Sequence, residues 1–351
     1  NLPFGWFLPL EDPIISNKGT VIAIAITVPL LLIIGSSKGK SQPKGKLSIT
    51  NLSEKFESMG NAVKSSLMNP KELKKFKKDL TKDKKKKDKN KEKDEKDSAF
   101  VLNFKGDIQA TEVEKLKQEI NAILLSEAPC KEVIIRVESG GGSAYAYGLC
   151  AAELKRLVDN DINLTVCIDK VAASGGYLMS CVASKIIAAP WAIVGSIGVI
   201  AQMPNFHRLL KKNSIDFEMH TAGAYKRTLT TLGENTEEGR KKFKSDLEDL
   251  HIIFKDFVKE QRPQVDTEVV ATGEVWQGKE AIDVGLIDSI ETSDNYLVSL
   301  SKKVNLFEIE FVEKKNLSEK FAFSMQIILE KSLLKFYDLI NRDRFISWIH
   351  S

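Results

Sequence analysis

The sequence predicts an α/β domain in which strands and helices alternate along the chain. Short runs of β-branched and other apolar residues, such as 133–137 (VIIRV), are typical of strands buried on both faces of a sheet. Segments with helical periodicity lie between these runs, and three glycine-rich sites come directly after predicted strands. Repeated strand–helix alternation favours parallel strands with helices packed against the sheet.

Each element is predicted from its local pattern. The clearest helix is 111–125, where Val113, Leu116, Ile120, Ile123 and Leu124 fall on one helical face. The run 192–200 contains two glycines and follows Pro190, so it predicts a buried strand–turn–strand rather than a membrane span. The other predicted strands are 99–104, 164–168 and 185–189, and the other predicted helices are 52–68, 143–158, 174–183 and 235–262.

An uncharged segment near the start predicts a membrane anchor. Residues 19–37 are 19 residues without a charge, and about 20 are needed to cross a bilayer as a helix. A cleaved signal peptide is the alternative, but no clear A-x-A site follows, so we expect a retained transmembrane helix. Composition then divides the chain into a lead and anchor (1–37), a juxtamembrane stretch with a charged linker (38–97), a globular domain (98–302) and an amphipathic tail (303–351).

Charge is concentrated in one stretch, although the net charge of the whole chain is only +4. Residues 71–97 contain fourteen lysines and eight acidic residues, which predicts a solvated linker or a loose charged helix. A polybasic patch near anionic lipid is the alternative. Because the rest of the chain is close to neutral, we do not expect binding to nucleic acid.

The four cysteines occur singly at 130, 150, 167 and 181, without a CxxC pair or a cluster with histidine. This spacing predicts no zinc or other metal site. We expect reduced or buried thiols.

Ser174 is the candidate nucleophile. It lies between a predicted strand and a predicted helix, and it is flanked by Ala172, Ala173, Gly175 and Gly176, which would let a peptide backbone approach. The position is similar in logic to the serine of G-x-S-x-G hydrolases, although the letters differ. Local sequence alone also allows Ser174 to be an ordinary helix N-cap.

A serine nucleophile needs a base. None of the four histidines has glycine-rich surroundings or an obvious partner, so no Ser-His-Asp triad is predicted. A lysine serves as a base when burial lowers its pKa. Lys226 lies among small and apolar residues in 220–230 (HTAGAYKRTLT), whereas the neighbouring Arg227 does not deprotonate usefully. A surface lysine in a loop is the alternative interpretation of Lys226.

Residues 140–142 are three consecutive glycines before the helix predicted at 143–158. Backbone N–H groups in such a turn hold an anion, either as a phosphate cradle or as an oxyanion hole. The spacing does not match G-x-x-x-x-G-K-[ST], which argues against a nucleotide site.

Several motifs occur together in a recognisable order: ESGGGSAYAYGL, DKVAASGGY, APWAIVGSIGVIAQMPNF, HTAGAYKRTLT, LGENTEEGR and ATGEVWQG. In this combination the chain resembles the signal peptide peptidase SppA family, most closely its SohB branch, over roughly residues 98–300. The resemblance implies a layered fold of repeated βα units like that of the ClpP and crotonase superfamily.

The resemblance also implies a Ser–Lys dyad that needs no metal or cofactor. Ser174 falls at the nucleophile and Lys226 at the general base, while Ser196 falls where the family has a serine that orients the lysine. The oxyanion hole falls on backbone N–H groups of Gly141, Gly142 and Gly175. One departure is Gly140, where family members usually have a proline, and glycine loosens this turn.

The function implied is a serine endopeptidase that cleaves signal-peptide remnants or other apolar peptides through an acyl-enzyme, in a ring-like homo-oligomer. We expect it in a bacterial inner membrane with a single pass. Lysines after the anchor favour a cytoplasmic catalytic domain, whereas the family favours the opposite side.

Two alternative functions are a catalytically silent membrane scaffold that binds apolar peptides and a crotonase-like enzyme acting on acyl-CoA. The tail, 303–351, fits an amphipathic helix against a neighbour or a bilayer, or one packed on its own domain.

Overall fold

A computed structural model describes residues 45–89 and 97–313 of the 351-residue chain. The predicted anchor and all but the first part of the predicted tail lie outside these residues. No helix within 45–89 and 97–313 is both long enough and apolar enough to cross a membrane.

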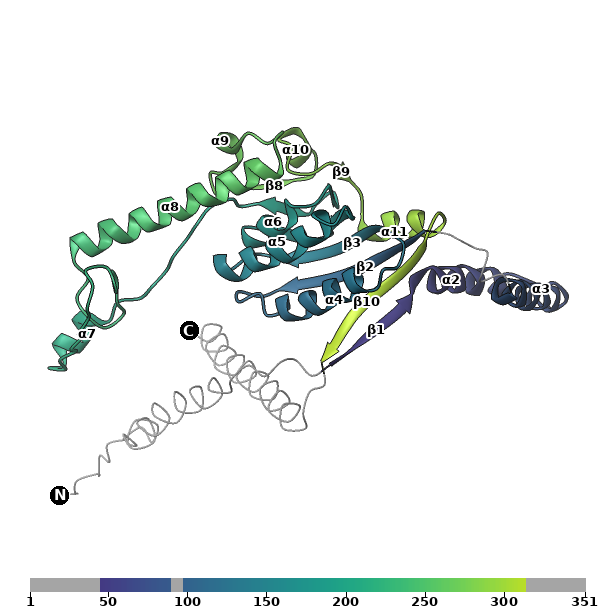
Figure 1. Cartoon of the computed structure of the whole chain (residues 1–351), viewed down its shortest axis with the longest axis horizontal. Coiled ribbons are helices and arrows are strands. Elements are labelled where there is room, and N and C mark those ends of the chain that lie inside the picture. The colour runs from purple at the N-terminus through teal and green to yellow at the C-terminus, as the bar shows by residue number, and fades with distance from the viewer. Residues whose placement is uncertain (1–44, 90–96, 314–351) are drawn as a thin grey trace, which may run out of the picture. The chain divides into compact units, whose positions relative to one another are not determined.

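The strands of the described residues form a single sheet (Figure 1). In chain order they are β1 (Gly45–Asn51), β2 (Ser98–Gly106), β3 (Cys130–Ser139), β4 (Asn163–Ile168), β5 (Val171–Ala173), β6 (Lys185–Ala188), β7 (Ile193–Gly195), β8 (Val275–Gln277), β9 (Ser289–Ile290) and β10 (Asn305–Glu313).

The sheet order is β1-β10-β2-β3-β4-β6-β9, and a branch leaves it as β3-β5-β7-β8. All pairings are parallel except β1 with β10 and β7 with β8. This confirms the mixed α/β class and the parallel strands predicted from the sequence. Because parallel strands end at one edge of a sheet, the loops after β3, β5 and β7 are brought together.

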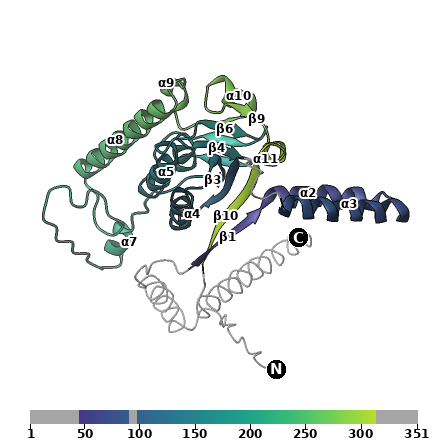
Figure 2. The same cartoon turned by 45° about the vertical axis from the view of Figure 1, so that its right-hand side comes forward.

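Helices cover both faces of the sheet (Figures 1 and 2). They are α2 (Leu52–Ser66), α3 (Pro70–Lys89), α4 (Val113–Leu125), α5 (Ala144–Val158), α6 (Gly175–Ser180), α7 (His207–Lys212), α8 (Glu237–Gln261), α9 (Thr267–Val270), α10 (Gly278–Asp283) and α11 (Ser293–Ser301).

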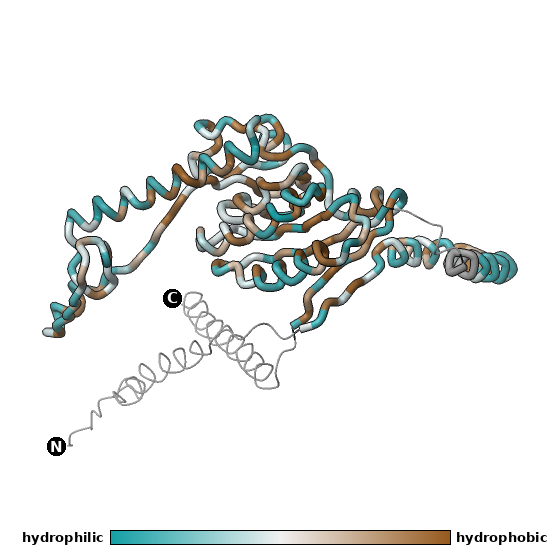
Figure 3. The backbone as a smooth tube through the Cα atoms, viewed as in Figure 1, coloured by the Kyte–Doolittle hydropathy of each residue, from teal (hydrophilic) through white to brown (hydrophobic). Residues whose placement is uncertain are grey.

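The core is divided by the sheet into two apolar clusters. On β3, Val133 and Ile135 belong to the larger cluster with α4, α5, α6 and α8, whereas Ile134 belongs to the smaller cluster with α2 and α11. Successive side chains of a strand point to opposite faces, so both faces of β3 are buried. This confirms the expectation that VIIRV is a strand buried on both sides. Figure 3 shows apolar residues, in brown, along the strands of the sheet.

The predicted elements agree with the structure except at three places. The run 192–200 forms a strand only over β7, because Gly195 and Ser196 both have positive φ and end the extended backbone. Residues 305–313, assigned to the tail from the sequence, form β10 between β1 and β2. Residues 45–51, assigned to the juxtamembrane stretch, form β1 and extend the same sheet.

The four cysteines are free thiols, as expected, and three of them are buried. Burial raises the pKa of the Cys150 thiol to about 12, which makes it an unreactive core residue.

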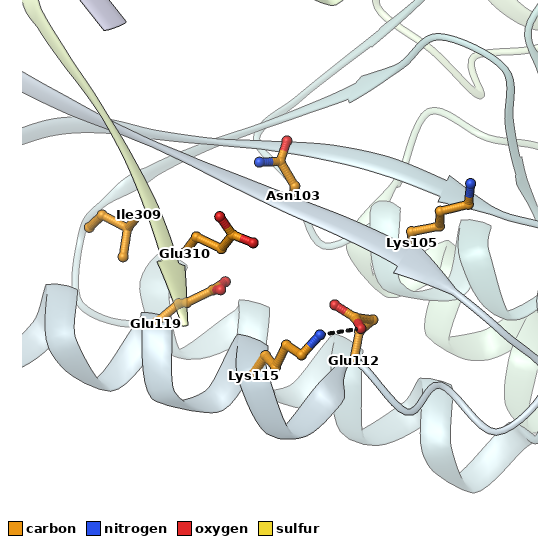
Figure 4. Close-up of a pocket in the computed structure, with 7 residues that line it drawn as sticks. All are labelled: Asn103, Lys105, Glu112, Lys115, Glu119, Ile309 and Glu310. Carbon is orange, nitrogen blue, oxygen red and sulfur yellow. Dashed lines mark hydrogen bonds and ion pairs between the residues drawn. The ribbon is translucent and has the colours of Figure 1, made fainter. Parts of the chain in front are cut away.

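A small pocket opens where β10 leaves β2 (Figure 4). The two strands pair only as far as Glu308, and beyond it the backbone N–H of Phe311 donates to Oε1 of Glu119 at 2.9 Å. Glu119 on α4 is only 3% exposed, and its Oε2 has no hydrogen-bond partner among the described residues. Burial therefore raises the pKa of Glu119 to about 7.

We predict that Glu119→Gln stabilises the protein above neutral pH. The folded state keeps the proton of Glu119 up to about pH 7, whereas the unfolded state loses it near pH 4.5, so stability falls as pH rises between these values. Glutamine keeps an acceptor for Phe311 but carries no charge, and should raise the free energy of unfolding at pH 8 by about 1–3 kcal/mol. Urea unfolding of the full chain at pH 5 and pH 8 measures this. Glu260→Gln, which removes an exposed carboxylate on α8, is the control; equal slopes against pH for wild type and Glu119→Gln would contradict the prediction.

Candidate active site

Ser174 lies at the junction of β5 and α6 with a strained backbone. Its φ and ψ are 52° and −120°, in a region that costs a residue other than glycine about 1–3 kcal/mol. The N–H donates to the Gly195 carbonyl at 2.8 Å, and the carbonyl accepts from the N–H groups of Tyr177 and Leu178, both at 2.9 Å. The backbone of Ser174 is therefore held on both sides.

The side chain of Ser174 is half-buried, and its hydroxyl makes no cap hydrogen bond. Ser174 occupies the N-cap position of α6 without acting as a side-chain cap. An unengaged hydroxyl on strained backbone at a strand–helix junction is a feature of nucleophilic serines.

Ser196 lies beside Ser174 at the ends of adjacent parallel strands. Ala173 of β5 is in register with Gly195 of β7, so the next residue on each strand is one of the two serines. Ser196 is also half-buried with a positive φ of 49°, and its N–H donates to the Glu274 carbonyl at 2.7 Å. The structure thus brings two of the predicted site residues to one place.

The glycine-rich turn packs directly against the Ser174 junction. A Cβ on Gly141 would lie 2.6 Å from the backbone nitrogen of Gly175 and 2.7 Å from Cβ of Ser174, and φ of Gly141 is +88°. A Cβ on Gly142 would lie 2.2 Å from the carbonyl oxygen of Ile108. No side chain fits at either position, so these glycines let two backbone segments approach closely.

The predicted oxyanion donors are not equivalent. The N–H of Gly141 already donates to Oγ of Ser139 at 3.0 Å. Among the described residues, nothing accepts from the N–H groups of Gly142 and Gly175, and Gly175 is the first residue of α6, where backbone donors have no partner within the helix. Gly142 and Gly175 are therefore the two donors left for a ligand.

Two residues that sequence reasoning did not single out support this turn. Tyr147 of α5 is fully buried, and its hydroxyl lies 2.5 Å from Oγ of Ser139 and donates to the Asp107 carbonyl at 2.7 Å. A Cβ on Gly175 would lie 2.5 Å from Cγ of the Tyr147 ring. Tyr147 and Ser139 were visible only as parts of the motif ESGGGSAYAYGL, which does not reveal that they meet.

Lys226 lies in a segment that leaves the core. No residue from 198 to 232 is buried, and α8 has no buried residue before Phe254; Figures 1 and 2 show α8 leading away from the sheet toward α7. The backbone N–H of Lys226 donates to the Gly223 carbonyl at 3.1 Å. Its exposed side chain has no hydrogen bond or ion pair with any residue in the described ranges, Ser174 included. The described residues of one chain therefore do not supply the burial that a lysine base requires.

These features define a class of protein. A half-buried serine with an unengaged hydroxyl, beside two backbone N–H groups that lack partners, is an arrangement for nucleophilic catalysis at a carbonyl group. No group of three or more His, Cys, Asp or Glu residues within 45–89 and 97–313 is arranged to hold a metal ion. The site is that of a serine-type peptidase, and the comparisons with known proteins agree.

The model of peptidase family S49 matches residues 156–306, and that of the N-terminal part of peptidase family S49 matches residues 14–154. A relative named "Probable protease SohB" from Buchnera aphidicola subsp. Schlechtendalia chinensis is 45% identical over 80% of this chain and 95% of its own. A relative of the same name from Haemophilus influenzae is 43% identical over 89% of this chain and 93% of its own. The chain belongs to peptidase family S49, which confirms the resemblance found in the motifs.

Among solved structures, a membrane-bound stomatin-specific protease, 1510-N, overlaps 58% of this chain and 84% of its own, with 15% identity and a TM-score of 0.40.

We predict that Gly140→Pro stabilises the turn without loss of activity. Gly140 is not in the left-handed region, a Cβ there would meet nothing within 4 Å, and its N–H donates to no described residue. The preceding Ser139 is extended in β3, as a residue before proline prefers. Proline should raise the free energy of unfolding by about 0.4–1 kcal/mol by restricting the unfolded chain.

Thermal or urea unfolding and peptide cleavage measure the two effects. Gly141→Ala is the matched control, since its φ of +88° and the close backbone leave no room for a methyl group, and both stability and cleavage should fall. A Gly140→Pro variant that unfolds more easily than wild type would contradict the prediction.

Proposed function

We propose that this chain is a membrane-anchored serine endopeptidase in which Ser174 attacks the peptide carbonyl and Lys226 is the general base. The observation that carries the proposal is the strained, unengaged Ser174 beside the N–H groups of Gly142 and Gly175. The parallel sheet with glycine turns at its strand ends supports the ClpP/crotonase-like fold that the family resemblance implies.

The proposed reaction has two halves. Neutral Lys226 takes the proton from Ser174, whose oxygen bonds to the carbonyl carbon of the substrate. The resulting oxyanion accepts from the N–H groups of Gly142 and Gly175, and collapse expels the amine with a proton from the lysine. Water, deprotonated by the same lysine, then attacks the acyl-serine. The bond between the carbonyl carbon and the Ser174 oxygen breaks, the acid is released, and the lysine returns the proton to the serine oxygen. The half-buried hydroxyl of Ser196, next to Ser174 in register, supports its proposed role of orienting the lysine amine.

We further propose that the dyad is completed in a homo-oligomer. The side chain of Lys226 has no hydrogen bond or ion pair within the described part of its own chain. The segment that carries it is rich in exposed apolar side chains, which favours contact with another protein surface. A second copy that covers this segment would also bury the lysine. The exposed large apolar residues here are Ile200, Met203, Phe206, Leu209, Ile215, Phe217, Met219, Tyr225 and Leu232.

We propose apolar peptides, including signal-peptide remnants, as substrates. An anchor at 19–37 would hold the site near the bilayer where such peptides are released, and the apolar side chains around Lys226 would contact them or the neighbouring copy. The proposed location is a bacterial inner membrane, with a single pass.

We predict that a fluorophosphonate labels Ser174 in the full chain. Ser174→Ala should abolish labelling because the attacking oxygen is removed, and Lys226→Ala should lower its rate at least about 100-fold because a general base is lost. Mass spectrometry of the labelled peptide and the rate of cleavage of an apolar peptide measure this. Arg227→Ala is the matched control, since it removes a cation from the neighbouring position and should leave labelling intact.

Undiminished labelling of Lys226→Ala would show that the lysine is not the general base, and no labelling of wild type would favour a catalytically silent scaffold.

Mixing the two inactive variants tests whether the serine and the lysine of one site come from different copies. If Lys226 acts on Ser174 of a neighbouring copy, co-expressed Ser174→Ala and Lys226→Ala chains should regain labelling at up to about a quarter of the sites in a closed ring. No recovery would place the lysine and the serine of one site in the same chain.

We predict that the full chain remains in the membrane pellet after alkaline carbonate extraction, whereas a variant lacking residues 1–37 is released. The 19 uncharged residues at 19–37 are the physical reason, since they are long enough to span a bilayer. Release of the full chain would contradict the anchor. A reporter fused after residue 97 then identifies the side of the membrane on which the catalytic domain lies.

A further inference from the structure

The fully buried Tyr147 contacts both parts of the backbone that carry the unpartnered donors. Its ring packs on Gly175, where a Cβ would lie 2.5 Å from Cγ of the ring. Its hydroxyl reaches Ser139, whose Oγ accepts from the N–H of Gly141 at 3.0 Å. One side chain thus spans the two segments that must stay in register for Gly142 and Gly175 to act on one oxygen.

The hydrogen bonds of this group run in one direction. The Tyr147 hydroxyl donates its single proton to the Asp107 carbonyl at 2.7 Å, so it can only accept in its contact with Ser139. The hydroxyl of Ser139 then donates to the oxygen of Tyr147 at 2.5 Å, and its own oxygen is free to accept from Gly141. Each hydroxyl is therefore used once as donor and once as acceptor, and the N–H of Gly141 is held in a fixed direction.

The loop beneath the turn is itself fixed. The carboxylate of Asp107 accepts from the N–H groups of Gln109 and Thr111 at 3.1 and 2.9 Å, and from the Thr111 hydroxyl at 2.8 Å. These bonds lower the pKa of Asp107, led by those from Thr111. The Ile108 carbonyl in this loop accepts from the N–H of Ser143 at 2.8 Å. The glycine turn thus packs on a loop that these hydrogen bonds hold in place.

We propose that Tyr147 and Ser139 are positioning residues that hold the Gly141–Gly142 turn in the geometry needed to stabilise the oxyanion. The inference rests on the proposed role of Gly142 and Gly175 as oxyanion donors. Gly140 has no side chain to restrain this turn, and the hydrogen bond from the N–H of Gly141 to Oγ of Ser139 restrains it directly. Both residues are buried, Ser139 at 2% and Tyr147 at 0% exposure, so they act through the turn and not by contact with a substrate.

Tyr147→Phe and Ser139→Ala should each lower kcat with KM nearly unchanged. Loss of an oxyanion donor itself costs about 100- to 1,000-fold, and a displaced donor should cost less, about 10- to 100-fold. Because the two residues act through one chain of hydrogen bonds, the double variant should lose no more than the worse single variant. Steady-state cleavage of an apolar peptide by the full chain measures all three.

Two further variants separate positioning from general stability. Tyr296→Phe removes a tyrosine hydroxyl that donates to Glu132 at 2.7 Å, in the cluster on the opposite side of the sheet, and should leave kcat unchanged. Gly140→Pro added to Ser139→Ala should restore at least part of kcat, because proline stiffens the same turn by another means. A residue that only stabilises the fold would give neither the separation of kcat from KM nor the rescue.

The outcomes are distinct. If wild type is not labelled at Ser174, the proposed function fails and the positioning role fails with it. If wild type is labelled but Tyr147→Phe and Ser139→Ala keep wild-type kcat, the proposed function stands and the positioning role is wrong. Additive losses of kcat in the double variant would also contradict the proposal that the two residues act through one chain of hydrogen bonds.

Discussion

The site depends on close backbone packing around Ser174. Its N–H donates to the Gly195 carbonyl at 2.8 Å. The segments beside it pack so closely that a Cβ on Gly141 or on Gly175 would clash with neighbouring atoms. A serine with φ of 52° is unfavourable on its own. Neighbouring backbone compensates for this strain, and the same contacts that hold the serine also set the positions of the free N–H groups beside it.

Sheet topology explains why this packing occurs where it does. β5 lies between β3 and β7 and ends at Ala173 after only three residues. Because α6 begins at Gly175, the chain turns from strand to helix at Ser174 alone. Strands β3 and β7 end at the same edge and deliver the glycine turn and Ser196 to either side of Ser174. The positions of Ser174 and Ser196 thus follow from parallel pairing and short strands. The glycine turn fits beside them because Gly141 and Gly142 have no side chain.

Much of this fold could be predicted from local patterns, because the apolar periodicity of 111–125 and the β-branched run 133–137 report burial directly. Pairing of β1 with β10 joins residues more than 250 positions apart, and no local pattern encodes it. Ser174 could be suggested from its small neighbours, but Tyr147 is one of two tyrosines in AYAY. Only the three-dimensional fold shows that Tyr147 is fully buried whereas Tyr145 is 89% exposed.

The site therefore has two parts with different physical character. Ser174 and its donors are surrounded by buried side chains and fixed hydrogen bonds, so they are preorganised before any substrate arrives. Lys226 belongs to a segment without a single buried residue from 198 to 232, which supplies neither the apolar surroundings nor the fixed partner that a lysine base needs. Among the described residues, the proposed nucleophile is therefore already in position, whereas the proposed base is not. If Lys226 is the general base, as proposed, another surface must cover this segment to supply the missing burial, and peptide cleavage would then be coupled to assembly.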